Sequence, residues 1–282
     1  MTGADDHAHM ARALGLARRG LYTTEPNPRV GCVLVRGGEV VGEGWHRRAG
    51  EPHAERVALA AAGERAHGAT AYVTLEPCCH HGRTPPCADA LFESGVSRVV
   101  AAMQDPNPLV GGNGLALLRR RGVEVEVGVG ADQARALNPG FIKRMSSGLP
   151  YMRCKLAASL DGRTAMASGE SRWITSEAAR RDVQFLRARS SAIVTGVGTL
   201  LADDPSLNVR LGADELPGAE PGEPVRQPLR VVVDSRLRTP PTARMLSLRG
   251  RTLIACVDQD PTHAVPLETA GANVYALPTR RS

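Results

Sequence analysis

Residues 76–87 read Glu-Pro-Cys-Cys-His-His-Gly-Arg-Thr-Pro-Pro-Cys and contain three cysteines and two histidines. Thiolates and imidazoles are the side chains that zinc prefers, so the composition of this stretch predicts a metal site. A second short stretch lies upstream, where residues 53–55 read His-Ala-Glu. A histidine, a glutamate two residues later and a following Pro-Cys form the arrangement in which a zinc ion activates water. These two stretches decide how the first half of the chain is expected to fold.

The number of ligands separates a catalytic zinc site from a structural one. A catalytic zinc ion has three protein ligands and one open position, whereas a structural zinc ion has four protein ligands. If His53, Cys78 and Cys87 are the ligands, Glu55 stays free to move protons beside the open position. Cys78 and Cys87 are farther apart than the two cysteines of a Pro-Cys-x-x-Cys motif, so the residues between them must form a loop. This spacing leaves three rival ligands, namely Cys79, His80 and His81.

The chain has 282 residues, which is long for one hydrophobic core and sufficient for two domains. Residues 146–148 read Ser-Ser-Gly, a composition typical of a linker. We therefore expect one domain over residues 1–147 and a second over residues 148–282. The six cysteines do not form a disulfide framework in a chain of this length. Because neither a signal peptide nor an apolar run of membrane-spanning length is found, we expect a cytoplasmic protein with no membrane partner.

The formal net charge of +6 favours an anionic partner, which could be a phosphorylated metabolite, a nucleotide cofactor or nucleic acid. Only 3 Phe, 2 Trp and 4 Tyr are available as stacking platforms for single-stranded nucleic acid. We therefore expect a small phosphorylated ligand and no nucleic acid. The sequence leaves the oligomeric state open, and a homo-oligomer is compatible with it.

Hydrophobic periodicity predicts an α/β sandwich in the first half. The expected elements are helix 8–19, strands 30–35 and 40–45, helix 53–62, strand 70–75, helix 88–93, strand 98–103, helix 115–121, strand 123–129 and helix 131–145. Strands 30–35 and 40–45 form a hairpin. His53 and Glu55 would lie on the first turn of an alanine-rich helix. Cys78 would follow Pro77 in a turn near a helix start, where backbone amides favour the thiolate.

In the second half, strands alternate with helices, which predicts a mainly parallel sheet. The expected elements are strand 151–156, helix 177–189, and strands 192–197, 229–233, 252–257 and 274–277. Residues 212–227 are rich in Gly, Pro and Glu and are interpreted as a solvated loop. Residues 196–199 read Gly-Val-Gly-Thr, which lets backbone approach a phosphate but is neither the dinucleotide glycine pattern nor a P-loop.

The stretches at residues 53–55 and 76–87 resemble the deaminase half of the bifunctional riboflavin biosynthesis family. The resemblance continues through Pro-Asn-Pro at 26–28, Asp-Pro-Asn-Pro at 105–108 and Lys-Leu-Ala-Ala-Ser-Leu-Asp-Gly at 155–162, and so covers nearly the whole chain. It implies an N-terminal cytidine-deaminase-like α/β/α sandwich and a C-terminal α/β domain similar to dihydrofolate reductase. The implied activities are zinc-dependent hydrolytic deamination of a phosphoribosylated diaminopyrimidinone and NADPH reduction of its ribosyl group to a ribityl chain.

The resemblance also implies roles for individual residues. Zinc would be held by His53, Cys78 and Cys87, and Glu55 would transfer protons. Substrate positions in the first half would be Asn27, His46, His80 and Arg83. The NADPH positions would be Ala157, Trp173, Thr199, Asp203 and Ser235. The ribose phosphate would be held by Ser171, Arg187, Leu207 and Arg210, with Lys155 near the sugar.

One feature departs from the family pattern. The reductase half of the family continues for several more strands and helices, including a late Glu-Gly-Gly segment, and no Gly-Gly pair follows residue 112 in this chain. We therefore expect an incomplete second sheet and a doubtful reductase step. Two other functions remain open from the residues, namely a zinc deaminase that acts on nucleic-acid bases and a structural zinc module without catalysis.

Overall fold

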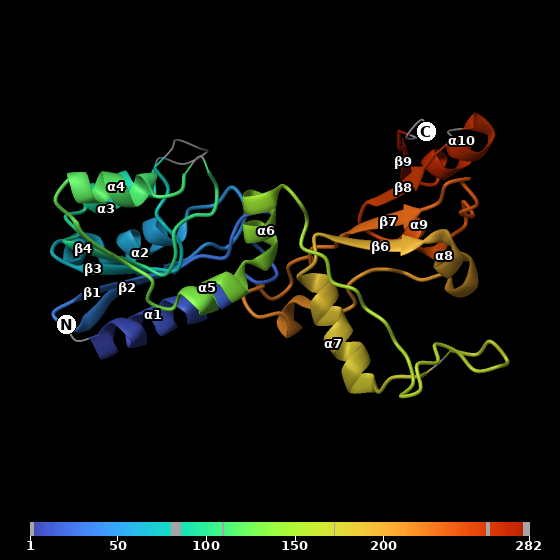
Figure 1. The fold of residues 1–282 in the computed structure, drawn as a ribbon, viewed down its shortest axis with the longest axis horizontal. Coiled ribbons are helices and arrows are strands. Elements are labelled where there is room, and N and C mark those ends of the chain that lie inside the picture. The colour runs from blue at the N-terminus through green and yellow to red at the C-terminus, as the bar shows by residue number, and fades with distance from the viewer. Residues whose placement is uncertain (1–2, 80–85, 109, 172, 258–259, 279–282) are drawn as a thin grey trace. The chain divides into compact units, whose positions relative to one another are not determined.

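The computed structural model describes residues 3–79, 86–108, 110–171, 173–257 and 260–278. The chain divides into two compact units. Unit 1 contains residues 1–154 and 217–219, and unit 2 contains residues 155–216 and 220–282. The domain boundary expected at residue 147 stays a prediction. Each unit has its own sheet, so each is described separately (Figure 1).

The sheet of unit 1 has five strands in the order β2-β1-β3-β4-β5. The hairpin strand β1 is antiparallel to both β2 and β3, whereas β3, β4 and β5 are parallel to one another. The strands are β1 (Gly31–Arg36), β2 (Glu39–Trp45), β3 (Thr70–Val73), β4 (Arg98–Ala101) and β5 (Glu124–Val127). The predicted hairpin and the predicted strands of the first half are therefore confirmed, with ends shifted by a few residues.

Helices cover both faces of this sheet because successive strand residues point to opposite sides. In β1, Cys32 and Leu34 face one core with α2 and α3, whereas Val33 and Val35 face a second core with α1 and α5. Figure 1 shows α3 and α4 on one side and α1 and α5 on the other. The helices are α1 (Gly3–Arg18), α2 (Ala54–Ala62), η1 (Gly63–Ala66), α3 (Cys87–Glu93), α4 (Asn113–Arg120), α5 (Ala131–Leu137) and α6 (Pro139–Ser147). The predicted α/β/α sandwich is thus confirmed.

A buried ion pair fastens α1 to the sheet. Asp6 is 4% exposed and accepts hydrogen bonds from both terminal nitrogens of Arg98, at 2.9 and 3.0 Å. The hydroxyl of Tyr72 donates to the same carboxylate at 2.6 Å. The hydrogen bonds from Arg98 are the main reason that the pKa of Asp6 falls to about 2. The carboxylate therefore contributes to stability only while it is ionised.

We expect this contribution to disappear in acid. Since the pKa of Asp6 is about 2 in the folded state and 3.8 ordinarily, its stabilisation is complete above pH 4 and is lost as the pH falls towards 2. The expected size is about 2 kcal/mol in the free energy of unfolding. Urea unfolding of the wild type and Asp6→Asn between pH 6 and pH 2 measures it, with exposed Asp132→Asn as control. Parallel stability curves for wild type and Asp6→Asn would contradict the prediction.

The sheet of unit 2 is entirely parallel, in the order β6-β7-β8-β9, as predicted. Its strands are β6 (Ala192–Gly196), β7 (Leu229–Val233), β8 (Thr252–Cys256) and β9 (Ala272–Ala276). Its helical elements are α7 (Glu177–Ala188), α8 (Val197–Asp203), η2 (Ala213–Glu215), α9 (Arg244–Ser247) and α10 (Pro261–Thr269). Val232 and Ile254 lie at the centre of its core, where Leu200, Met245 and Leu267 are also buried.

The strand predicted over residues 151–156 is wrong, since the segment is neither strand nor helix. Met152 and Leu156 are 82% and 79% exposed. The alternating apolar residues suit a strand, but strand hydrogen bonds require a neighbour, and none of the described strands pairs with this segment. The order of the parallel sheet therefore begins at β6.

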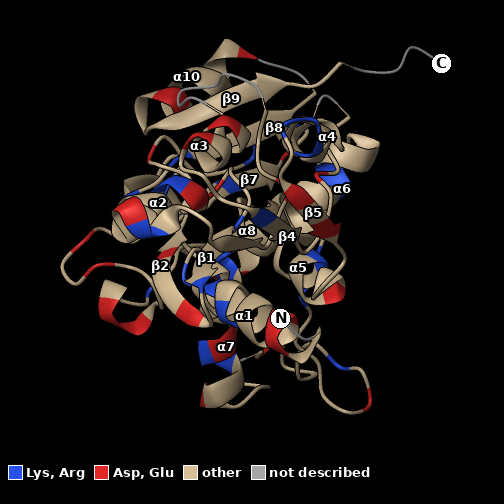
Figure 2. Ribbon diagram, turned by 90° about the vertical axis from the view of Figure 1, so that its left-hand side faces the viewer, with Lys and Arg blue, Asp and Glu red and all other residues tan. Residues whose placement is uncertain are grey.

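Acidic and basic side chains are interspersed on two helices of unit 1, α2 and α5. Figure 2 shows both signs on α2, which carries Glu55 and Arg56, and on α5, which carries Asp132 and Arg135. The net positive charge is therefore not gathered on these two helices. Among the helices that the structure describes, none combines the length and the apolar character needed to cross a membrane.

Candidate metal centre and active site

The N-terminus of α2 positions two of the predicted functional residues. His53 is the residue that precedes the helix, with an extended backbone, and Glu55 lies in the first turn with 3% of its surface exposed. Close packing of α2 on β2 fixes this end of the helix. A Cβ atom at Gly44 would lie 2.4 Å from the carbonyl oxygen of Ala54, so only glycine permits this approach. The helix start is thus held directly against the sheet.

The two cysteines reach the same place from the end of β3 and the start of α3. Cys87 is the first residue of α3, and its backbone N–H donates to the Cys78 Sγ at 3.3 Å. The backbone N–H of Ala88 donates to the Cys78 carbonyl at 3.1 Å. A helix start presents free N–H groups, which favour a nearby thiolate. The prediction that the thiols lie near a helix start is therefore confirmed.

The side chains of His53, Cys78 and Cys87 converge, with their ligand atoms within 4.8 Å of one another. The His53 Nδ1 lies 3.6 Å from the Cys78 Sγ and 3.4 Å from the Cys87 Sγ. A tetrahedral zinc ion with Zn–S of about 2.3 Å and Zn–N of about 2.0 Å places a nitrogen and a sulfur ligand about 3.5 Å apart. The three side chains therefore fit zinc in both ligand type and spacing, and they leave a fourth position without a protein ligand among the described residues.

Electrostatics around the three ligands favour one negative thiolate. Hydrogen bonds from Cys87 and His53 lower the pKa of Cys78 to about 4, with the Cys87 contribution the larger. The hydrogen bond to Cys78 and burial raise the pKa of Cys87. The hydrogen bond to Cys78 also raises the pKa of His53. Burial, followed by the charge on Cys78, raises the pKa of Glu55 to about 7.

A hydrogen-bonded pair of polar side chains lies beside His53. The Asn27 side-chain nitrogen is 3.0 Å from the His46 Nε2, and the His46 Nδ1 is 3.1 Å from the Pro52 carbonyl oxygen. A carbonyl oxygen only accepts, so His46 Nδ1 carries the proton and Nε2 accepts from Asn27. The His46 and His53 rings meet edge to face, with centroids 5.4 Å apart. The structure thus brings two of the predicted substrate positions next to a predicted zinc ligand.

Glu76 ties the cysteine stretch to a distant loop. Its Oε2 accepts from the backbone N–H groups of Asp105 at 3.0 Å and Gly112 at 2.8 Å. Its Oε1 accepts from those of Gly114 at 2.9 Å and Leu115 at 3.3 Å. The carboxylate is 3% exposed and caps the start of α4 from two residues before Cys78. Glu76 therefore holds the entry to the metal centre in place.

We expect Glu76→Gln to destabilise the protein by about 3 kcal/mol, because an amide NH2 would face two backbone donors in a buried site. The displaced entry to Cys78 should also weaken zinc affinity by about 10-fold to 100-fold. Urea unfolding and competition for zinc with a chelator measure the two effects. Glu93→Gln, on the exposed side of α3, is the matched control and should change neither quantity. Wild-type stability and affinity in Glu76→Gln would show that Glu76 does not hold this site.

Two family models match the chain. The cytidine and deoxycytidylate deaminase zinc-binding region matches residues 4–103, and the RibD C-terminal domain matches residues 150–269. The riboflavin biosynthesis protein RibD of Escherichia coli (strain K12) is 59% identical over 257 residues, which are 90% of this chain and 70% of that protein. The chain belongs to the RibD family of riboflavin biosynthesis proteins. It therefore combines a zinc-binding deaminase domain with an NADPH-dependent reductase domain.

Other RibD proteins give the same assignment. The RibD of Aquifex aeolicus (strain VF5) is 43% identical over 272 residues, or 96% of this chain and 74% of that protein. A structure of Acinetobacter baumannii RibD matches with a TM-score of 0.89 and 50% identity, covering 99% of this chain and 75% of that one. A deaminase/reductase structure from Thermotoga maritima matches with a TM-score of 0.82 and 34% identity, covering 96% and 80%. These matches confirm the expected cytidine-deaminase-like and reductase folds.

The remaining candidates of the RibD deaminase domain differ in what the structure shows. Cys79 lies outside the group of converging ligand atoms, so the structure does not support Cys79 as an alternative ligand to Cys78 or Cys87. The predicted substrate positions His80 and Arg83, and the rival ligand His81, lie outside the described residues. Glu76 has no role in the expectations drawn from the sequence. The signal for it was a glutamate directly before Pro-Cys together with the later Gly-Gly-Asn-Gly at 111–114, whose backbone can approach a carboxylate closely.

In the RibD reductase domain, three of the NADPH candidates share one edge of the sheet. Thr199 and Asp203 lie on α8, which directly follows β6, and Ser235 follows β7. The Ser235 carbonyl accepts from the N–H of Val257, which follows β8, at 3.3 Å. Thr199 and Ser235 follow the carboxyl ends of parallel strands, where ligands bind in open α/β sheets, and Asp203 is the last residue of α8. Their arrangement suits a cofactor site.

The phosphate candidates form a second group. The Arg187 guanidinium, in the last turn of α7, donates to the Asn208 carbonyl at 3.0 Å. The backbone N–H of Arg210 donates to the Gln184 side chain at 3.1 Å, so both arginines are tied to α7 and the segment that follows Leu207. Burial, together with the nearby charge of Arg210, lowers the pKa of Arg187. Leu207 itself is buried, with a φ of 47°.

The other four reductase candidates lie in the segment 155–173, whose described residues form neither helix nor strand. The segment carries Lys155, Ala157, Ser171 and Trp173. Trp173 is 71% exposed and stacks with the Arg180 guanidinium, which is 4.3 Å from the ring centroid. Within the described part of the chain, no hydrogen bond joins these residues to Thr199, Asp203 or Ser235. The structure therefore does not bring them together with the other NADPH candidates.

Proposed function

We propose that the first domain catalyses the hydrolytic deamination of a phosphoribosylated diaminopyrimidinone, with zinc held by His53, Cys78 and Cys87. The observation that carries this proposal is the convergence of the three ligand atoms within 4.8 Å of one another, at the start of the helix whose first turn holds buried Glu55. A buried carboxylate beside metal ligands, but not itself a ligand, suits proton transfer rather than structural coordination.

Bound zinc supplies the Lewis acidity that makes water nucleophilic at neutral pH. Glu55 accepts the proton of the attacking water and delivers it to the leaving amine, so that ammonia departs as the ring carbon gains oxygen. The position of Glu55 is fixed by the close contact of α2 with β2. Burial of Glu55 keeps bulk water from competing for the transferred proton.

The substrate is oriented by polar groups next to the metal centre. Asn27 and His46 form one hydrogen-bonded unit whose tautomer is set by the Pro52 carbonyl. The Asn27 amide also has a carbonyl oxygen, which can accept from an amino group of the pyrimidine. His80 and Arg83, which lie outside the described residues, are assigned to substrate by the resemblance to the family and by their place between Cys78 and Cys87 in the sequence.

We further propose that the second domain, over residues 148–282, binds NADPH and reduces the ribosyl group. The cofactor set comprises Ala157, Trp173, Thr199, Asp203 and Ser235. The substrate set comprises Lys155, Ser171, Arg187, Leu207 and Arg210. The support is the grouping of Thr199, Asp203 and Ser235 at the carboxyl edge of the sheet and the pairing of Arg187 and Arg210, whose guanidinium geometry suits phosphate.

The deaminase domain of this proposal covers residues 1–147. The enzyme is proposed to be cytoplasmic, with neither nucleic acid nor a membrane as partner, and a homo-oligomer is compatible with the proposal. Few aromatic residues and the interspersed charges of α2 and α5 support a small-molecule partner.

The test is to incubate the purified zinc-loaded chain with the phosphoribosylated diaminopyrimidinone and to follow ammonia release, with and without NADPH. Ammonia should form without NADPH, and NADPH should be oxidised only after deamination has supplied the product. A chain that holds zinc and releases no ammonia from this compound, but deaminates single-stranded nucleic acid, would overturn the proposal.

A further inference from the structure

A cavity lined by arginines lies at the amino edge of the unit 2 sheet, opposite the edge that carries Thr199 and Ser235. Its volume is about 380 Å³. The residues that matter here, called the arginine pocket, are Ser191, Arg226, Gln227, Arg249, Gly250 and Arg251. Ser191 directly precedes β6, and Arg251 directly precedes β8. The pocket therefore uses the starts of the strands, whereas the NADPH candidates use their ends.

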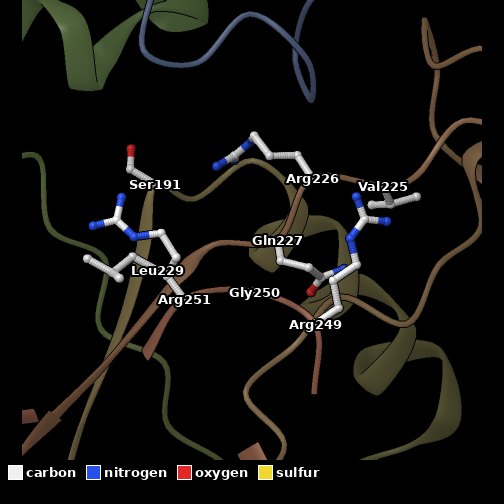
Figure 3. Close-up of a pocket in the computed structure, with 8 residues that line it drawn as sticks. All are labelled: Ser191, Val225, Arg226, Gln227, Leu229, Arg249, Gly250 and Arg251. Atoms are coloured by element: carbon white, nitrogen blue, oxygen red, sulfur yellow. The ribbon is translucent and has the colours of Figure 1, made fainter. Parts of the chain in front are cut away.

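The positive charges of Arg249 and Arg251 are not neutralised by acidic side chains in the walls of this pocket. No acidic side chain is among the described residues that line it. Arg249 and Arg251 are exposed, and neither forms a salt bridge or side-chain hydrogen bond with any residue in the described part of the chain. Figure 3 shows their guanidinium groups on two sides of the space, with Arg226 and Ser191 along a third. Two exposed guanidinium groups without a counter-charge, on two sides of one cavity, favour an anion inside it.

Arg226 and Gln227 are held in place by backbone contacts. The Arg226 Nη2 donates to the carbonyls of Ala188 at 3.0 Å and Ser190 at 2.8 Å. The Gln227 side chain accepts from the Val209 N–H at 2.8 Å and donates to the Val209 carbonyl at 3.3 Å. Their side chains therefore need little reordering to receive a ligand, which lowers the entropic cost of binding.

A fourth guanidinium lies directly beneath the pocket. Arg230 is 2% exposed, and its Nη2 donates to the carbonyls of Gly250 at 2.7 Å and Leu248 at 3.0 Å. Its Nε donates to the Thr252 hydroxyl at 3.0 Å, while its Nη1 is buried without a hydrogen-bond partner. No carboxylate among the described residues pairs with this buried cation. A buried charge of this kind is costly unless a counter-charge is nearby, and an anion above Gly250 would supply one.

Arg230 also shapes the turn that presents the two exposed arginines. Its contacts with Leu248 and Gly250 bracket Arg249, and its own backbone N–H donates to the Arg251 carbonyl at 3.0 Å. Gly250 has a φ of 115°, which side chains rarely adopt, so the turn requires glycine. The turn is thus built to carry an arginine on either side of a glycine.

We infer that the arginine pocket binds the phosphate group of a small sugar phosphate. Its volume lies near the lower end of small-molecule sites, roughly 300–1,000 Å³, which suits a phosphate with one sugar ring and excludes a dinucleotide. Arginine forks bind phosphate oxygens bidentately, and the remaining amide hydrogen of Gln227 can donate to a sugar hydroxyl. This site is separate from Arg187 and Arg210, which are assigned to the ribose phosphate of the substrate and do not line the cavity.

The test is calorimetric titration of the full zinc-loaded chain with ribose 5-phosphate, with inorganic phosphate and ribose as separate probes. Ribose 5-phosphate should bind, inorganic phosphate should compete with it, and ribose should not bind. The double variant Arg249→Gln with Arg251→Gln should weaken binding at least tenfold. Because both side chains are exposed, its thermal unfolding in phosphate-free buffer should match the wild type.

Two further variants make the result specific. The double variant Arg36→Gln with Arg120→Gln removes the same charge from unit 1 and should bind like the wild type. Arg210→Gln weakens only ribose 5-phosphate bound at the proposed substrate site, so one equivalent should still bind in the arginine pocket of this variant. Unchanged affinity in the Arg249/Arg251 variant, equal weakening in the unit 1 variant, or loss of all binding in Arg210→Gln would each overturn the inference.

Discussion

Replacing Glu55 with Gln is expected to lower deaminase turnover by about 10²-fold to 10⁴-fold, the range by which a positioned acid or base accelerates reactions. Gln keeps the size of the side chain and its polarity but cannot accept and return a proton. Zinc should remain at one ion per chain, because Glu55 is not one of the three converging ligands. Ammonia release and metal analysis on the same preparation measure both quantities.

The control for this variant is Glu64→Gln, an exposed carboxylate in the short helix that follows α2. It should keep full turnover. Undiminished turnover in Glu55→Gln would remove Glu55 from the mechanism. Loss of zinc together with turnover would instead mean that the carboxylate is a fourth ligand, as in a structural zinc site.

The second large effect is expected from Cys87→Ala, which should abolish stoichiometric zinc binding and deaminase activity together. Cys87 is fully buried, and its Sγ lies 3.4 Å from the His53 Nδ1, so alanine leaves two ligands and an empty space. A site with two protein ligands holds zinc far less tightly than one with three. Metal analysis after dialysis against a weak chelator gives the stoichiometry.

The matched control is Cys154→Ala, because Cys154 is a free and exposed cysteine. That variant should retain one zinc ion per chain. If Cys87→Ala still bound one zinc ion per chain, the proposed ligand set would be contradicted. Cys79 would then be the next cysteine to test as the third ligand. When the Cys87→Ala variant is given the deaminated product, it should still oxidise NADPH. This result distinguishes the loss of the metal site from a chain that has failed to fold.

The sequence predicts most of the first sandwich because its signals are local. The short apolar run of β1 and the alanine-rich periodicity of α2 each identify their own element, and apolar residues of both are buried. The convergence of His53 with Cys78 and Cys87 also follows, because residue types and spacing specify the chemistry. The Glu76 contacts are not predicted, because the glycines at 111–114 permit a close approach to a carboxylate but do not specify which carboxylate makes it.

In the second half of the chain, several elements cannot be predicted from local sequence. Residues 151–156 have the composition of a strand, but a strand depends on a neighbour that local sequence does not specify. Helix α8 begins at Val197, within the Gly-Val-Gly-Thr at residues 196–199, where no helix is predicted from the sequence. Helix α10 contains Pro261 and Pro266, which obscure its periodicity, and Asp260 caps its start. Tertiary packing determines these elements more than intrinsic preference does.

The hydrogen bonds from the N–H groups of Cys87 and Ala88 to Cys78 join the two ends of the chain segment between the cysteines. These contacts hold the two cysteines together, and none of the three converging ligands lies between them. Under the proposed function, we expect substitutions between the two cysteines to change the affinity for the pyrimidine while one zinc ion per chain stays bound. Specificity could then be altered without rebuilding the metal centre.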